Sequence, residues 1–262
     1  MIRPNPDRRD VLAMAAALAL ASPAKAAAMT RSSPIVELRQ YTTRPGRRDD
    51  LIDLFDREFV KPQEAGGIRV IGQFRDLDDP NRFVWMRGFE DMPARATSLT
   101  AFYGGAPWLA RRDAANATIL DSDNVLLLHP LGADGGFDLQ RPSSNGFVPV
   151  EIRYLDRGAA PAFADFFAGH VRPRIAQAGA QVLATFVTEQ SANNFRLPVR
   201  ENLSVLVAVL GFADAAHHAA YQAALAHGSD WRAEAPEALL AQFARKPEVL
   251  RLTPTAGSRL RG

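Results

Sequence analysis

The sequence Val36-Glu37-Leu38-Arg39 returns 114 residues later as Val150-Glu151-Ile152-Arg153. Further echoes follow in the same order: Val60 to Pro62 with Val171 to Pro173, Gly67 to Phe74 with Gly179 to Phe186, and Gly88-Phe89 with Gly211-Phe212. The offsets drift between 111 and 123 residues, as insertions in loops would produce. An ordered series of this kind indicates two copies of one structural unit within the chain.

Both copies show the same succession of hydrophobic patterns. The first copy has strand-like segments at 35–42, 68–74, 83–89 and 125–128, and helical segments at 49–64, from Met92-Pro93 onward and after Pro107. The second copy has strand-like segments at 148–155, 181–188, 203–210 and 249–252, and helical segments at 159–178, 213–227 and 236–243. The order β-α-β-β-α-β predicts a ferredoxin-like unit in each copy.

These patterns divide the chain into four parts. We expect an N-terminal segment 1–26, a first domain 34–131, a Gly- and Pro-containing linker 132–146 and a second domain 147–254. A ferredoxin-like sheet has helices on one face and leaves the other face open, so two tandem copies can cover each other. The sequence therefore predicts an α+β fold in which two ferredoxin-like (βαββαβ) units pack sheet to sheet.

The first 26 residues have the pattern of an export signal. Arg8-Arg9 precede an Ala/Leu-rich run from Val11 to Ala21, and Ala24-Lys25-Ala26 has the small residues of a cleavage site. The run is shorter than the ~20 residues that span a bilayer, so no stable membrane anchor is predicted. We expect a twin-arginine signal, cleaved after about Ala26, that engages the twin-arginine export machinery and delivers the protein to the periplasm. An ordinary secretory signal and a cytosolic amphipathic tail are the alternatives.

The remaining composition excludes several classes of function. Of 31 basic and 29 acidic residues, 27 of each lie beyond this signal, so no clustered positive excess predicts nucleic-acid binding. The chain has no cysteine, which excludes disulfides, thiolate nucleophiles and cysteine-ligated metals. The sequence also lacks a nucleophile elbow, a P-loop and a dinucleotide-binding glycine pattern.

The repeated strand carries charge on alternate residues. Glu37, Arg39 and Tyr41 share one face, because successive strand residues point to opposite sides. We expect the apolar face to lie on the helices and the polar face to point at the partner sheet, where Glu151 and Arg153 point back. Buried charges need partners, so glutamate–arginine pairing is expected there.

This polar face has two interpretations. One is an ion-pair network that fixes how the copies dock. The other is the polar end of a ligand pocket, because aromatic walls with a few convergent polar groups are typical of small-molecule sites. Further pocket residues would then be Trp85, Arg87, Phe102, Tyr103 and Trp108.

The first half resembles a known family. Residues 37–42, Glu-Leu-Arg-Gln-Tyr-Thr, followed by Arg44-Pro45-Gly46, resemble the opening of NIPSNAP proteins, and the 83–89 strand with Trp85 and the later Trp108 are also similar. The resemblance reaches the second half only through the repeat, where Leu155 replaces Tyr41. It implies a dimeric α+β barrel, a fold that hosts cofactor-independent monooxygenases, haem-binding or haem-degrading enzymes and binding domains. The family has no agreed reaction, and fold does not imply function.

Metal and cofactor signals are weak. The five histidines show no metal-binding spacing, so no metal site is predicted. No cofactor is predicted either, although the resemblance leaves haem open, with His170 as the candidate ligand.

Three functions remain open. The protein could bind a small aromatic or hydrophobic molecule between its two halves. It could instead be a cofactor-independent monooxygenase or haem-linked oxidoreductase, with Glu37, Arg39 and Tyr41 orienting or deprotonating a phenolic substrate against Trp85 and Trp108. It could also be a non-catalytic interaction module, and further homo-oligomerisation is open. Because Tyr41 occurs only in the first copy, we expect the site there, with the second copy as its lid.

Overall fold

The computed structural model describes residues 33–140, 146–227 and 235–261. The signal predicted at residues 1–26 lies outside them. Within these ranges no helix is both long and apolar enough to cross a membrane.

The first half follows the predicted order. Strand β1 (Ile35–Thr43) leads into one continuous helical segment, followed by a hairpin, two further helices and a long strand. These elements are α2 (Arg48–Leu54), η1 (Phe55–Phe59), α3 (Val60–Ala65), β2 (Arg69–Asp76), β3 (Arg82–Phe89), α4 (Met92–Gly104), α5 (Ala106–Asn116) and β4 (Ile119–Pro130). The Asp91 carboxylate caps α4 by accepting from the Ala94 N–H at 2.7 Å, and Pro93 occupies its first turn.

The second half repeats this order. Its elements are β5 (Val148–Tyr154), α6 (Ala160–Phe166), η2 (Phe167–Val171), α7 (Arg172–Gln177), β6 (Gln181–Thr188), β7 (Val205–Gly211), α8 (Ala215–His227), α9 (Glu237–Ala244) and β8 (Glu248–Pro254). The halves share local detail: a π-helical turn, η1 or η2, interrupts the first helix of each. Gly67 and Gly179 then end these helices with φ of +85° and +102°, a conformation that favours glycine.

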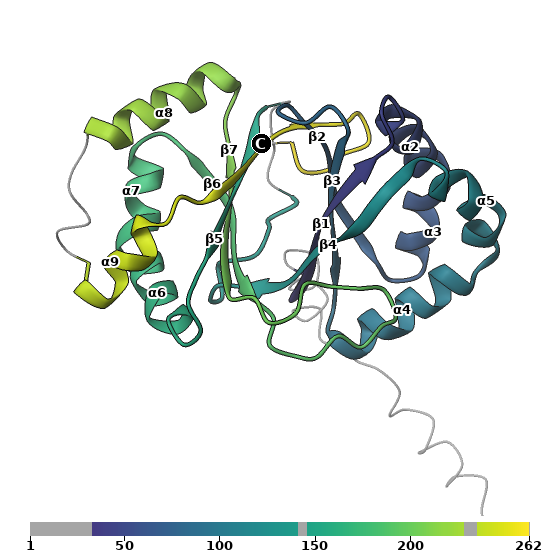
Figure 1. The fold of residues 1–262 in the computed structure, drawn as a ribbon, viewed down its shortest axis with the longest axis horizontal. Coiled ribbons are helices and arrows are strands. Elements are labelled where there is room, and N and C mark those ends of the chain that lie inside the picture. Colours follow the sequence, from purple (N-terminus) through teal and green to yellow (C-terminus); the bar gives the residue numbers. More distant parts are fainter. Residues whose placement is uncertain (1–32, 141–145, 228–234, 262) are drawn as a thin grey trace, which may run out of the picture.

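The eight strands in the described ranges form one closed antiparallel barrel in the order β1-β3-β2-β8-β5-β7-β6-β4. The halves meet at two seams, where β2 pairs with β8 and β4 pairs with β6. Helices α2 to α5 cover one side of the barrel and α6 to α9 the opposite side (Figure 1). Each half thus supplies four adjacent strands and its own helical layer.

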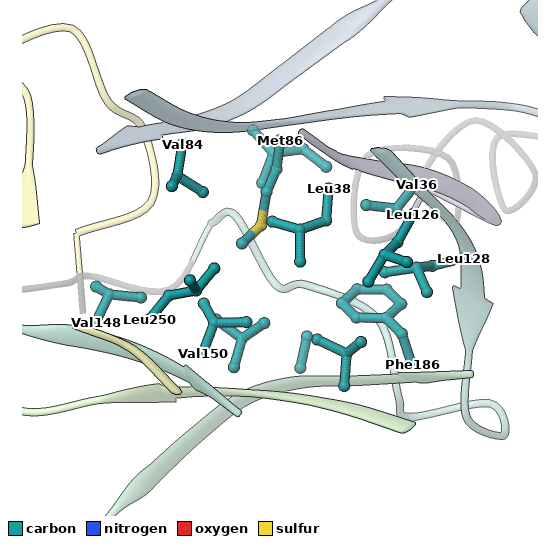
Figure 2. Close-up of a cluster of buried hydrophobic side chains, with 14 of the residues drawn as sticks. Val36, Leu38, Val84, Met86, Leu126, Leu128, Val148, Val150, Phe186 and Leu250 are labelled. Carbon is teal, nitrogen blue, oxygen red and sulfur yellow. The ribbon is translucent and has the colours of Figure 1, made fainter. Parts of the chain in front are cut away.

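The barrel interior is apolar. Side chains from all eight strands fill it, among them Val36, Leu38, Val150 and Phe186, which face one another across the barrel (Figure 2). The expectation that the apolar face of β1 lies on the helices is therefore wrong. Both faces of β1 are buried. Its apolar side chains point into the closed barrel interior. Its polar side chains point outward under the helices, where charged partners are available.

Segments outside the two predicted domains complete this interior. Phe137, from the predicted linker, packs on Phe186 with ring centroids 5.1 Å apart. Leu260, beyond the predicted end of the second domain, joins the same core, and its N–H donates to the Ile71 carbonyl at 3.0 Å. The Gln73 N–H donates to the Ser258 hydroxyl at 3.0 Å, so the C-terminal segment is anchored on the first half.

Leu260→Ala is expected to lower the free energy of unfolding by about 2–5 kcal/mol, the range for a buried leucine truncation. Leu260 is 6% exposed in the barrel core. Leu120→Ala is the control, because Leu120 is 57% exposed, and its effect should stay within about 0.5 kcal/mol. Denaturant unfolding measures both, and equal effects would show that the C-terminal segment does not stabilise the barrel.

Candidate functional site

A buried carboxylate organises the outer face of the first half. Glu37 on β1 receives Arg39 Nη1 at 2.6 Å, Arg87 Nε at 2.7 Å and Arg95 Nε at 2.7 Å. Arg87 stands opposite Glu37 in the β1–β3 ladder, whereas Arg95 comes from α4. All four side chains are at most 2% exposed. We call Glu37, Arg39, Arg87 and Arg95 the arginine cluster.

The arginines fix the charge of Glu37. Burial by itself raises the pKa of this carboxyl, but the guanidiniums of Arg87, Arg39 and Arg95 outweigh it and hold the pKa well below its ordinary value. Glu37 is therefore ionised at neutral pH and saturated with donors. It is a structural counter-ion and too weak a base to accept a proton from a substrate.

A cavity of about 100 Å³ lies beside the cluster, between the outer face of the sheet and the helices. Its walls are mainly aromatic, and its lining includes Tyr41, Phe55, Phe59, Trp85, Phe102, Tyr103 and Trp108. Arg39 borders it and donates from Nε to the Tyr41 hydroxyl oxygen at 3.1 Å. The exposed Asn116 and half-buried Ser122 also line it, which places them at its rim. We call this the aromatic cavity.

Tyr41 lines this cavity, and its side chain is a neutral phenol. Burial raises its pKa, and the neighbouring Arg39 offsets this only in part. Because its oxygen accepts from Arg39, its own hydroxyl hydrogen remains available to a ligand. Tyr41 can therefore orient an acceptor group.

A loop from the second half covers the cluster and the cavity. The loop of residues 189–201, the covering loop, extends from β6 towards α4 (Figure 1). Arg95 Nη1 donates to Asn193 Oδ1 at 3.1 Å and to Asn194 Oδ1 at 2.7 Å. The ring of Phe195 stacks on Tyr103 with centroids 5.7 Å apart, and Leu197 lines the cavity.

The structure brings together eight of the ten predicted pocket residues, on the outer face of the first half. They are Glu37, Arg39, Tyr41, Trp85, Arg87, Phe102, Tyr103 and Trp108. Arg95 and the covering loop were missed, as was Gln63, which lines the cavity and accepts from Arg87 Nη1 at 3.3 Å. The signal for Arg95 is its place on the apolar stripe of α4, in helical spacing with Leu99 and Phe102.

Glu151 and Arg153 lie elsewhere, which corrects the expectation that they face Glu37 and Arg39. They sit on the outer face of β5, under the helices of the second half, and approach each other at 3.7 Å. Burial raises the pKa of Glu151, and Arg153 offsets this only in part. The positions that match Arg87 and Arg95 hold Leu210 and His218, so the second half lacks two of the three arginines.

A larger groove of about 950 Å³ is lined by residues of the covering loop together with residues of β4 and α6. It contains the His129–Glu189 pair, with Nδ1 and Oε2 3.3 Å apart. Although its volume is typical of ligand sites, its walls are mixed and largely loop residues. The aromatic cavity, although smaller, is where buried charge and aromatic surface converge.

The candidate haem ligand lies away from both the groove and the aromatic cavity. His170 is exposed on η2, its ring stacks on Phe166 with centroids 4.6 Å apart, and it borders neither the groove nor the aromatic cavity. Across the described ranges, no group of three or more histidine, cysteine or acidic residues is placed to hold a metal ion.

Glu37→Gln should lower the free energy of unfolding at pH 7 by about 3–5 kcal/mol, because it leaves buried arginines without a counter-ion. The folded-state pKa of Glu37 is depressed, so its contribution is present above the unfolded pKa near 4.5 and is lost as pH falls below it. Glu37→Gln should therefore flatten the acid limb of the stability profile, measured by denaturant titration at pH 7 and pH 4.

Glu151→Gln is the matched control. The folded-state pKa of Glu151 is raised, so its ionised form costs stability at neutral pH. The substitution should be neutral or stabilising at pH 7, within about 1 kcal/mol. Equal losses in both variants would contradict the special role assigned to Glu37.

Comparisons with known proteins find a family match in the first half of the chain. Residues 36–131 match the NIPSNAP family model. A NIPSNAP-like domain protein from Burkholderia xenovorans is 27% identical, with a TM-score of 0.35, and the match covers 37% of this chain and 85% of that protein. A comparison with curated proteins gives no match.

Two solved structures match across both halves. A candidate monooxygenase from Lactobacillus acidophilus gives a TM-score of 0.52 at 13% identity, covering 85% of this chain and 94% of the other. A candidate monooxygenase from Fusobacterium nucleatum gives a TM-score of 0.54 at 8% identity, and the match covers 85% of this chain and 93% of the other. These likenesses show a shared α+β barrel fold, and the family match covers residues 36–131 in the first half of the chain.

Proposed function

We propose that the protein binds a small molecule in the aromatic cavity of its first half. The observation that carries this proposal is the convergence of Arg39 and Tyr41 on a cavity with aromatic walls, covered by a loop from the other half. Buried polar groups beside aromatic surface can fix the orientation of a ligand as well as hold it. The site lies outside the barrel, because the space between the two halves is filled with apolar side chains.

The size of the cavity limits the ligand. Its volume of about 100 Å³ is below the ~150 Å³ of an engineered cavity that holds benzene. A compact ligand with few non-hydrogen atoms therefore fits best, and a ring would need a small outward movement of the rim or the covering loop. Phe59, Trp85 and Trp108 would supply apolar contact with its body.

Catalysis is the second candidate, suggested by the fold shared with candidate monooxygenases. The aromatic walls and the covering loop would keep water from a reactive substrate, which favours such a role. However, Glu37 is held ionised by three arginines and Tyr41 is held neutral by burial. Neither group is suited to deprotonate a phenolic substrate at neutral pH, so we place binding ahead of catalysis.

We also infer that the barrel is built from two tandem ferredoxin-like units. The sequence echoes support this, as does the strand order within each half, β4-β1-β3-β2 and β8-β5-β7-β6, which is the same when each half is numbered from its own first strand. The units would then cover each other's open sheet faces, as the layer rule requires.

Filling the cavity from its rim tests the binding proposal. Ser122→Phe should place a ring in the aromatic cavity and abolish binding of small aromatic probes such as phenol, measured by ligand-observed NMR. Asp123→Phe is the control, because Asp123 is exposed and is not among the lining residues. Absence of phenol binding to the native protein, or equal binding to all three proteins, would refute the proposal.

We further propose that the protein is exported through the twin-arginine pathway. The proposal rests on Arg8-Arg9 ahead of a mild apolar run and a small-residue cleavage site. Changing both arginines to lysine should retain the full-length precursor in the cytoplasm, whereas the unaltered chain should appear in the periplasm, shortened by about 26 residues. Cell fractionation followed by mass spectrometry measures the location and the length of the protein. Export that is unaffected by the substitution would point to the general secretory route.

A further inference from the structure

We propose that the ligand of the aromatic cavity is a small organic carboxylate whose charged end rests on Arg39 and Tyr41. This inference rests on the proposed binding function and adds the chemical class of the ligand. It is carried by the charge balance of the arginine cluster, by buried donors without partners and by the contrast with the second half.

The arginine cluster has an excess of positive charge. Three guanidiniums surround one carboxylate, so its formal charge is +2, and arginine does not lose its proton in proteins. Within the described ranges, Glu37 is the only acidic residue that forms an ion pair with them. Their other partners are neutral: Tyr41, Gln63, Asn193 and Asn194. A buried charge excess is costly unless an anion balances it.

Several donors of the cluster also lack partners. Nη2 of Arg87 and Nη2 of Arg95 are buried, and neither has a hydrogen-bond acceptor among the residues that the structure describes. The same holds for the indole N–H of Trp85, whose ring lies beneath the guanidiniums of Arg39 and Arg87 at 5.4 and 5.1 Å. The arginine cluster thus holds more donors and more positive charge than the residues in contact with it balance.

An anion in the aromatic cavity would balance the positive charge of the arginine cluster by contacting Arg39. This side chain uses Nη1 for Glu37 and Nε for Tyr41 and borders the cavity. Its Nη2 and the hydroxyl hydrogen of Tyr41 remain available to a ligand. A carboxylate has two acceptor oxygens and suits this pair, and such charge-assisted hydrogen bonds are the stronger kind. An inorganic anion would leave the aromatic walls without contact.

The second half supports the assignment by contrast. There one glutamate, Glu151, approaches one arginine, Arg153, so their formal charges cancel. Leu210 and His218 replace the other two arginines, and burial lowers the pKa of His218, which favours its neutral form. The charge excess therefore occurs in the half that has the aromatic cavity.

Isothermal titration calorimetry of the native protein tests the inference by comparing the affinities of matched acids and amides. The probes are isobutyrate against isobutyramide and benzoate against benzamide, because each amide keeps the shape and removes the charge. We expect at least one acid to bind at least tenfold more tightly than its amide. Equal affinities would overturn the carboxylate inference and leave the binding proposal intact. If none of the four probes binds and phenol does not bind either, both proposals fail.

Variants locate the effect. Arg39→Gln should remove the preference for the acid, whereas Arg153→Gln, at the matching position of the second half, should keep it. Because loss of the buried Arg39 can destabilise the fold, Tyr41→Phe provides a milder test: it removes the hydroxyl donor and should weaken acid binding about threefold or more with little effect on the amide. An undiminished acid preference in Tyr41→Phe and in folded Arg39→Gln would exclude this placement of the carboxylate.

Discussion

The ion pairs of Glu37 hold the first half together. One carboxylate joins β1 to β3 through Arg87 and the sheet to α4 through Arg95. Arg95 then extends the connection to the covering loop through Asn193 and Asn194. A buried carboxylate is tolerated only with such partners, so sheet, helix and loop must dock together for the cluster to form.

The sequence predicts the element order well, because strand and helix patterns and their glycine stops are local properties. The predicted strand at 181–188 coincides with β6, and the helix predicted at 159–178 corresponds to α6, η2 and α7 together. The direction of the two strand faces could not be predicted in the same way. Alternation separates the residues of β1 into two sets, but both sets are buried, and only the closure of the barrel decides which one points inward.

The strand and aromatic residues of the first half were predicted as parts of the candidate site, and the residues that join it through distant contacts were missed. Glu37, Arg39 and Trp85 follow from strand alternation. The bonds between Arg95 and the covering loop span 98 and 99 residues, and no periodicity connects their partners. The linker and the C-terminal segment show the same limit: Phe137 and Leu260 enter the barrel core from regions without a regular pattern.

The two halves share a topology but contribute different parts of the candidate site. The first half holds the aromatic cavity and the unbalanced arginines, whereas the second half has the Glu151–Arg153 pair and supplies the covering loop. A first half on its own would lose Phe195 and Leu197 from the cavity and both asparagines from Arg95. Two identical halves would place a cavity and a loop on each side, whereas two copies in one chain can diverge independently. A barrel formed by two unlike halves of one chain therefore gives a physical route to a single covered site.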